Sequence, residues 1–155
     1  MTLGAPRFEV GRELLIAGYN ERYTFESRKN IPQQWDRCSL HIGRIPGQIG
    51  AVSYGVCWNY DPGRGFDYLS GVEVASTEEL PGDFRHVVLP AQRYAVFTHE
   101  GHVSTIPDTI QAIWRDWLPN SGHEVSAAPS FERYTEEFDG ETGEGGIEIW
   151  IPIRQ

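Results

Sequence analysis

Gly146-Ile147-Glu148-Ile149-Trp150-Ile151-Pro152-Ile153, close to the C-terminus, opens like a segment near the middle of the chain. Gly71-Val72-Glu73-Val74 matches Gly146 to Ile149 at an offset of 75 residues. The same offset, without a gap, pairs Ile31-Pro32 with Ile106-Pro107 and Tyr19 with Tyr94. Self-similarity at a fixed period indicates a repeated structural unit. We therefore predict two copies of one module, at about residues 7–76 and 82–153, in one domain that spans residues 1–155.

Each module is predicted to contain a strand, a helix and two strands. Extended segments at 8–25 and 84–101 precede helices that begin near Asn30 and Thr105, each with a proline in the first turn, where a missing N–H costs nothing. Apolar residues at helical spacing predict two buried stripes: Ile31, Trp35, Cys38 and Ile42, then Ile106, Ile110, Ile113, Trp114, Trp117 and Leu118. The strands that follow are expected at 51–58, 66–75, 131–138 and 146–153.

These elements predict an α+β fold, a twisted antiparallel sheet with both helices on one face and a pseudo-two-fold axis between the duplicated β-α-β-β modules. An antiparallel sheet can leave its other face bare. Since side chains alternate along a strand, the isoleucines of 147–151 are expected to face the helices, and Glu148 and Trp150 the other side. Glu73, between two valines, follows the same rule. We expect a ligand groove there, lined by carboxylates and aromatic rings.

Length and composition favour one globular domain: 155 residues, of which 39% are hydrophobic and 12% aromatic. The 13 Lys+Arg against 22 Asp+Glu give a net charge of −9, which argues against direct nucleic-acid binding because phosphate requires a basic surface. No apolar run approaches the roughly 18 residues of a membrane span, and the N-terminus lacks the profile of a signal peptide. Two cysteines cannot form a disulfide framework. We expect a cytoplasmic protein without membrane contact.

Other motifs indicate no metal or cofactor. His99 and His102 are three residues apart and lack the His-Glu-x-x-His spacing of a zinc site. The glycine-rich segment 140–146 carries glutamates that would repel phosphate, so it is typical of a hairpin turn rather than of a nucleotide-binding loop. No Gly-x-Ser-x-Gly elbow is present for a serine nucleophile.

Four blocks, in this order, resemble the GyrI-like superfamily: Tyr-Ala-Val-Phe-Thr-His-Glu-Gly at 94–101, Trp-Leu-Pro-Asn-Ser-Gly at 117–122, Pro-Ser-Phe-Glu-Arg-Tyr at 129–134, and Ile-Glu-Ile-Trp-Ile-Pro-Ile at 147–153. The N-terminal half resembles the family through its duplicated layout and the strand at 71–74. The superfamily includes the effector-binding domains of AraC-type and MerR-type multidrug-sensing regulators.

The resemblance implies a groove that binds lipophilic, often cationic molecules by means of an acidic residue and stacking aromatic rings. By motif position it implies Glu132 and Tyr134 as ligand residues, followed by Glu148 and Trp150, and it leaves open which glutamate is central. Aromatic residues outside the helical stripes, together with the second strand glutamate, complete the candidate ligand set: Tyr54, Trp58, Tyr68 and Glu73.

Each candidate also has a purely structural interpretation. The tryptophans on the helical stripes are predicted to be core residues. Glu73 and Glu148 alternate with apolar neighbours as residues of a solvated strand face do, and Trp58 and Tyr134 also fit half-buried sheet aromatics without a ligand. Tyr94 could close the core in parallel with Tyr19.

The first functional hypothesis is a binding protein for lipophilic, cationic or aromatic small molecules. The alternative is a hydrolase of strained cyclopropane-type toxins, an activity that the resemblance also implies, with Glu132 or Glu148 as general base. A weaker alternative is a gyrase-inhibitor-like interaction protein. Regulators of the family carry a helix-turn-helix segment before this domain; a first strand at residue 8 leaves no room for one, so we expect a stand-alone binder, with a separate regulatory protein as a conceivable partner.

Overall fold

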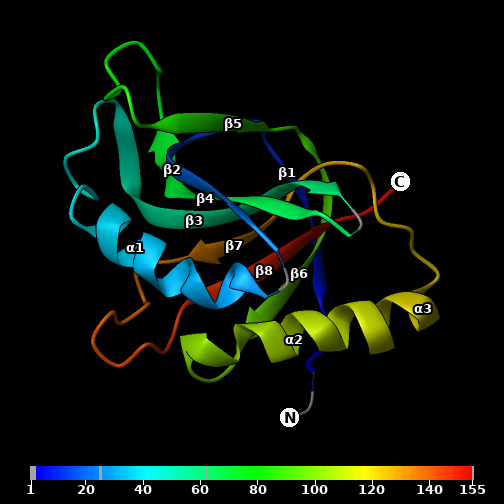
Figure 1. Ribbon diagram of the computed structural model, residues 1–155. Helices are drawn as coiled ribbons and strands as arrows, with labels where there is room; N and C mark the ends of the chain where they lie inside the picture. The colour runs from blue at the N-terminus through cyan, green and yellow to red at the C-terminus, as the bar shows by residue number, and fades with distance from the viewer. Residues whose placement is uncertain (1–2, 25, 62, 155) are drawn as a thin grey trace.

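The computed structural model describes residues 3–24, 26–61 and 63–154. Eight strands and two helical segments follow one another along the chain (Figure 1). The strands are β1 (Arg7–Gly11), β2 (Leu14–Tyr23), β3 (Gln48–Asp61), β4 (Gly65–Val74), β5 (Arg85–Leu89), β6 (Gln92–His99), β7 (Ser130–Tyr134) and β8 (Ile147–Pro152). The helices are α1 (Ile31–Ser39), α2 (Ile106–Ala112) and α3 (Leu118–Ser121), with one π-helical turn (Ile113–Trp117) joining the last two and short 3-10 turns before α1 and α2.

All strands belong to one antiparallel sheet with the order β1-β6-β8-β7-β3-β4-β2-β5. The order is symmetric about the contact between β7 and β3. The first unit consists of β2, α1, β3 and β4, and the second unit repeats this arrangement with β6, α2, β7 and β8. The predicted α+β fold with two β-α-β-β units is therefore confirmed. The exact limits of the repeats, 7–76 and 82–153, stay a prediction.

The two units exchange their leading strands. β1 pairs with β6 of the second unit, and β5 pairs with β2 of the first. Only two residues separate β1 from β2, and two separate β5 from β6, although the two strands of each pair lie toward opposite ends of the sheet. A connection this short spans about 10 Å at most. The sheet must therefore curl until its ends approach each other, and it forms a half-barrel.

This exchange changes the predicted strands. The extended segments expected at 8–25 and 84–101 are each divided into two strands that pair with different partners. Pro90, between β5 and β6, lacks the N–H that a continuous ladder would need. Both helices begin where their Ile-Pro dipeptides predict. Pro119 lies in the first turn of α3, and the helical segment ends at Gly122, whose φ of 76° is a left-handed cap.

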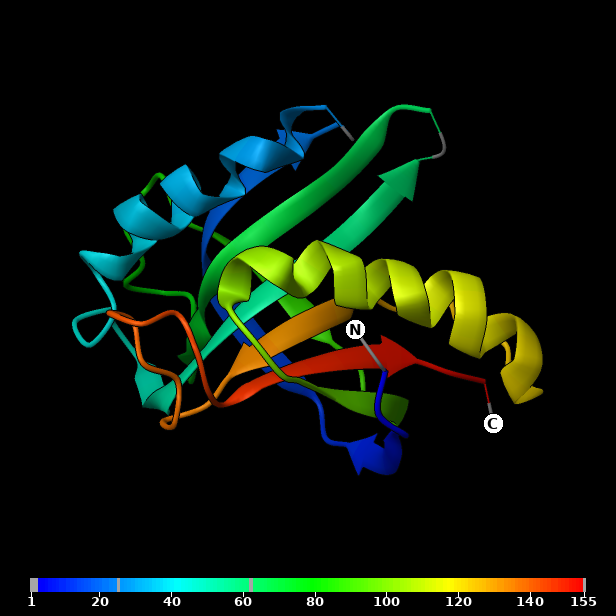
Figure 2. The ribbon, with the colours of Figure 1, turned by 90° about the horizontal axis from the view of Figure 1, so that it is seen from below.

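Both helices cover the same face of the sheet, one over each unit (Figure 2). The isoleucines of β8 and the valines of β4 point toward them, as the alternation predicts. The other face buries a separate cluster formed by β2 to β7. Tyr19 belongs to the helix side and Tyr94 to the opposite side, so the predicted parallel between these two tyrosines is wrong. Within the described residues, no helix has the length and apolar character needed to cross a membrane.

Gln34 fastens α1 to the sheet. Its side-chain amide donates to the carbonyl oxygens of Tyr19 and Tyr68 and to the hydroxyl of Ser70, at 2.9 to 3.1 Å, and its oxygen accepts from Tyr23. All these groups are buried, so each bond is made where water cannot replace it. The next residue, Trp35, is thereby held over the junction of the two units, where it packs against both helix-side clusters.

Candidate functional site

The eight predicted ligand residues fall into two groups on opposite faces of the sheet. Glu132, Tyr134 and Tyr68 lie on the face that the helices cover. The remaining five lie on the other face: Tyr54, Trp58, Glu73, Glu148 and Trp150. One groove cannot contain both groups, because the backbone of the sheet separates them.

Glu132 occupies the centre of the helix-covered face, on one of the two middle strands. The hydroxyl groups of Tyr68 and Tyr134 both donate to its Oε1, at 2.9 and 2.6 Å. Tyr134 is two residues further along β7 and so shares its face. Tyr68 comes from β4, on the far side of β3, and its side chain must cross β3 to reach the carboxylate.

Gly55 makes that crossing feasible. It lies directly opposite Glu132 in the β3–β7 ladder, and the ring of Tyr68 lies over it. A Cβ atom at Gly55 would overlap the hydroxyl of Tyr68 and lie 3.0 Å from Oε1 of Glu132. The glycine is thus required by the close approach of a side chain, not by its own backbone angles.

Trp35 completes the cluster, and sequence reasoning missed it. Its indole N–H donates to the hydroxyl of Tyr68 (2.8 Å), and its ring lies edge-on to those of Tyr68 and Tyr134, with centroids 6.5 and 5.3 Å apart. Its place on the helical stripe predicted a core residue, but Trp35 is only partly buried, and of that stripe only Cys38 is fully buried. No signal in the sequence shows that the indole N–H of Trp35 bonds to the tyrosine that in turn donates to Glu132.

Glu132 is a buried carboxylate without a cationic partner. Only 9% of its surface is exposed, and among residues 3–24, 26–61 and 63–154 no ion pair reaches it. Burial raises its pKa above the ordinary value, although the hydrogen bonds from Tyr134 and Tyr68 act in the opposite direction. Burial and the nearby charge of Glu132 raise the pKa of both tyrosines well above their ordinary value, so both hydroxyls remain protonated donors.

The second oxygen of this carboxylate is available. Both tyrosines bind Oε1, and within the described part of the chain Oε2 accepts no hydrogen bond. Among the described residues, every fully buried side-chain oxygen has a hydrogen-bond partner. Since Oε2 of Glu132 has none, it is not fully buried and retains some contact with solvent. Cys57 lies on the same face, opposite Tyr68, and burial raises the pKa of its thiol, which keeps it neutral. No three His, Cys, Asp or Glu side chains of the described residues are grouped to hold a metal.

The two strand glutamates on the opposite face are already paired. Arg12 binds both oxygens of Glu73, at 2.8 and 2.9 Å. Glu148 accepts from Arg7 (2.8 Å) and Arg133 (3.0 Å). Partial burial opposes ionisation of Glu148, but the hydrogen bonds from Arg7, the Trp150 indole and Arg133 hold its pKa below the ordinary value. A positively charged ligand would have to displace arginine from either carboxylate.

The aromatic candidates of this face are packed or hydrogen-bonded. Tyr54 is buried against Phe131, with ring centroids 5.8 Å apart. Trp58 packs on the same cluster and donates its indole N–H to Asn20 (3.0 Å). Trp150 stacks on Phe131, with centroids 5.2 Å apart and an interplanar angle of 19°.

Two curated bacterial proteins resemble the chain in sequence. The transcriptional regulator BrlR of Pseudomonas aeruginosa is 35% identical over 125 residues, which cover 79% of this chain and 46% of BrlR. The probable transcriptional regulator YgiV of Escherichia coli K12 is 32% identical over 112 residues, which cover 65% of this chain and 66% of YgiV. The chain thus spans less than two thirds of the length of either relative.

A solved structure shares the fold. The protein SAV2435, determined with bound tetraphenylphosphonium, superposes with a TM-score of 0.76 at 20% identity, over 96% of this chain and 93% of that one. The model of the GyrI-like small molecule binding domain matches residues 5–154, nearly the whole chain. The fold, the sequence relatives and this match agree, and the chain belongs to the GyrI-like family of small-molecule-binding domains.

Proposed function

We propose that the protein binds lipophilic organic cations on the helix-covered face of its sheet, with Glu132 as the counter-charge. The observation that carries this proposal is a buried carboxylate that has two neutral hydroxyl donors but no cationic partner among the described residues. A buried charge is costly unless it is paired. A cationic guest would supply the missing charge, and its apolar surface would contact the surrounding rings.

The aromatic side chains fit the same ligand class. Trp35, Tyr68 and Tyr134 surround the carboxylate with π-systems, and each ring that faces a cation contributes about 0.5–2 kcal/mol. We infer that Trp35 is the side chain that yields to the guest. It is only partly buried, and a single hydrogen bond joins its polar edge to the cluster. The related protein SAV2435 has been determined with tetraphenylphosphonium, a cation of this class, which makes it a suitable probe.

Isothermal titration calorimetry with tetraphenylphosphonium tests the proposal. We expect saturable binding, and binding at least about tenfold weaker for the uncharged analogue triphenylphosphine oxide, because a neutral guest leaves the carboxylate unpaired. Thermal unfolding should report the same order, since a ligand that binds only the folded state raises the Tm. Equal affinity for the charged and the neutral compound would contradict the role of Glu132.

The affinity for tetraphenylphosphonium should depend on pH. A bound cation favours the ionised form of Glu132, whose pKa in the folded protein lies above the ordinary value. The affinity is therefore expected to be constant above that pKa and to fall by up to about tenfold per pH unit below it. Titrations from pH 8 to pH 4 in buffers of different ionisation enthalpy would measure both the affinity and the proton released. A flat profile across this range would exclude a titrating carboxylate in the site.

The raised pKa of Glu132 also favours a second candidate, hydrolysis of a strained cyclopropane. Glu132 is then the general base that takes a proton from water, and a raised pKa makes it a stronger base at neutral pH. The water oxygen forms a bond to a ring carbon, the strained C–C bond breaks, and the carbon released takes up the proton. Mass spectrometry of a cyclopropane-bearing compound after incubation would show a product heavier by one water, lost in Glu132→Gln.

A further inference from the structure

We propose a second ligand site on the opposite face of the sheet, one that binds flat aromatic anions such as aryl carboxylates or phosphates. It consists of a cavity of about 330 Å³ that opens beside β1. No residue of the Glu132 cluster lines it, and the sheet lies between the two sites. This proposal therefore does not depend on the proposed cation site.

Aromatic rings form the wall of this cavity. Trp150 stacks on Phe131, and Tyr94 meets both rings edge-on, with centroids 5.4 Å from each. Gly11 leaves the space open, since a Cβ atom there would lie 2.9 Å from the ring of Tyr94. A wall of this shape offers a planar ligand both a ring face and ring edges to contact.

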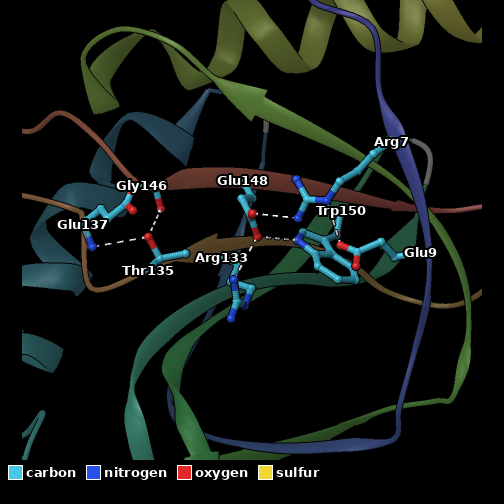
Figure 3. A network of polar contacts seen from close by, with 8 residues as sticks. All are labelled: Arg7, Glu9, Arg133, Thr135, Glu137, Gly146, Glu148 and Trp150. Atoms are coloured by element: carbon cyan, nitrogen blue, oxygen red, sulfur yellow. Dashed lines mark hydrogen bonds and ion pairs between the residues drawn. The ribbon is translucent and has the colours of Figure 1, made fainter.

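The charged side chains that line the cavity are mainly basic. Arg7, Arg12 and Arg133 are at its surface with a single acid, Glu9, while Glu73 and Glu148, which balance the charge of the arginines, do not line the cavity. Glu73 and Glu148 hold the arginines in place. Figure 3 shows Arg7, Arg133 and the Trp150 indole converging on the Glu148 carboxylate.

The arginines retain donors for a ligand. A guanidinium has five N–H groups. Arg133 uses one of them on Glu148 and interacts with the hydroxyl of Tyr54, and Arg12 uses two on Glu73. Because these contacts fix each side chain before a ligand arrives, less conformational entropy is lost on binding. Carboxylate and phosphate groups match the planar fork of arginine and can accept from the N–H groups that the glutamates leave unused.

The test compares 2-naphthoate with the uncharged 2-naphthamide by calorimetry. We expect naphthoate to bind at least about tenfold more tightly than the amide, and Arg133→Gln to lower its affinity by about tenfold. Arg12→Gln, at a side chain that is 69% exposed, should cost about threefold without affecting folding. Arg64→Gln makes the same change of charge at a distant side chain, 82% exposed, and should leave the affinity unchanged.

Two further readouts separate this site from the cation site. Glu132→Gln should leave naphthoate binding intact, and tetraphenylphosphonium should not displace it. In NMR spectra naphthoate should move the indole N–H signal of Trp150 but not that of Trp35, with assignments from Trp150→Phe and Trp35→Phe. Equal affinity for naphthoate and the amide, equal affinity in the three arginine variants, or competition by the phosphonium would overturn the proposal.

Discussion

Replacing Glu132 with glutamine is expected to weaken tetraphenylphosphonium binding by up to about a hundredfold. A unit charge about 6 Å from a carboxylate gains roughly 3 kcal/mol at an effective dielectric constant of about 20, and each 1.4 kcal/mol is a factor of ten in affinity. Glutamine keeps the shape of the side chain and an oxygen that can accept from Tyr68 and Tyr134, so the loss reports the charge. Calorimetry on both proteins at pH 8 measures it directly.

Glu148→Gln is the matched control for this substitution. It removes one carboxylate charge from β8 on the opposite face, where the arginines already compensate it. We expect the phosphonium affinity of this variant to stay within about twofold of the wild type. Equal losses in the two variants would mean that the cation senses the overall charge of the protein rather than Glu132, and the assignment of the site would be wrong.

Gly55→Ala is expected to lower the free energy of unfolding by about 1–3 kcal/mol, the usual cost of excess volume in a packed interior. The new methyl group would overlap the hydroxyl of Tyr68 and lie 2.7 Å from its Cζ atom, so the ring must move and lose its bond to Glu132. Urea denaturation would measure the change. Gly82→Ala, with no atom within 4 Å of the added carbon, should stay within about 0.5 kcal/mol.

A double variant shows whether Tyr68 is the cause. Tyr68→Phe removes the hydroxyl that the methyl group would overlap, so Gly55→Ala should cost less in that background than in the wild type. A coupling of at least about 0.5 kcal/mol between the two changes is expected for groups in contact. Strict additivity would place the strain elsewhere on β3.

The sequence predicts the fold well where local patterns decide it. The alternation at 147–151 and at 72–74 reveals which side chains face the helices, and the two Ile-Pro dipeptides mark the helix starts. The pairing of β1 with β6 and of β5 with β2 is not predictable in this way, because each strand selects a partner in the other unit. The match of Tyr19 with Tyr94 also misleads, because both fit the 75-residue offset but their side chains face opposite sides of the sheet.

The candidate site is predicted only in part. Residue spacing places Glu132 and Tyr134 on one face of β7, and the family resemblance marks both, but neither shows that Tyr68 and Trp35 reach the same carboxylate. Those contacts depend on the space above Gly55 and on the docking of α1 through Gln34. The arginines that neutralise Glu73 and Glu148 come from β1, the β1–β2 connection and β7. No strand pattern reveals such pairs.

The exchanged strands make the molecule equivalent to an arm-swapped homodimer joined into one polypeptide. In a true homodimer the two strands that meet at the dyad would carry identical residues, and any acid there would face its own copy across a few ångströms. Covalent fusion removes that restriction. Here one central strand provides the carboxylate of Glu132, and the other provides Gly55, whose missing side chain leaves room for the ring of Tyr68. A symmetric scaffold thereby holds one asymmetric negative charge at its centre.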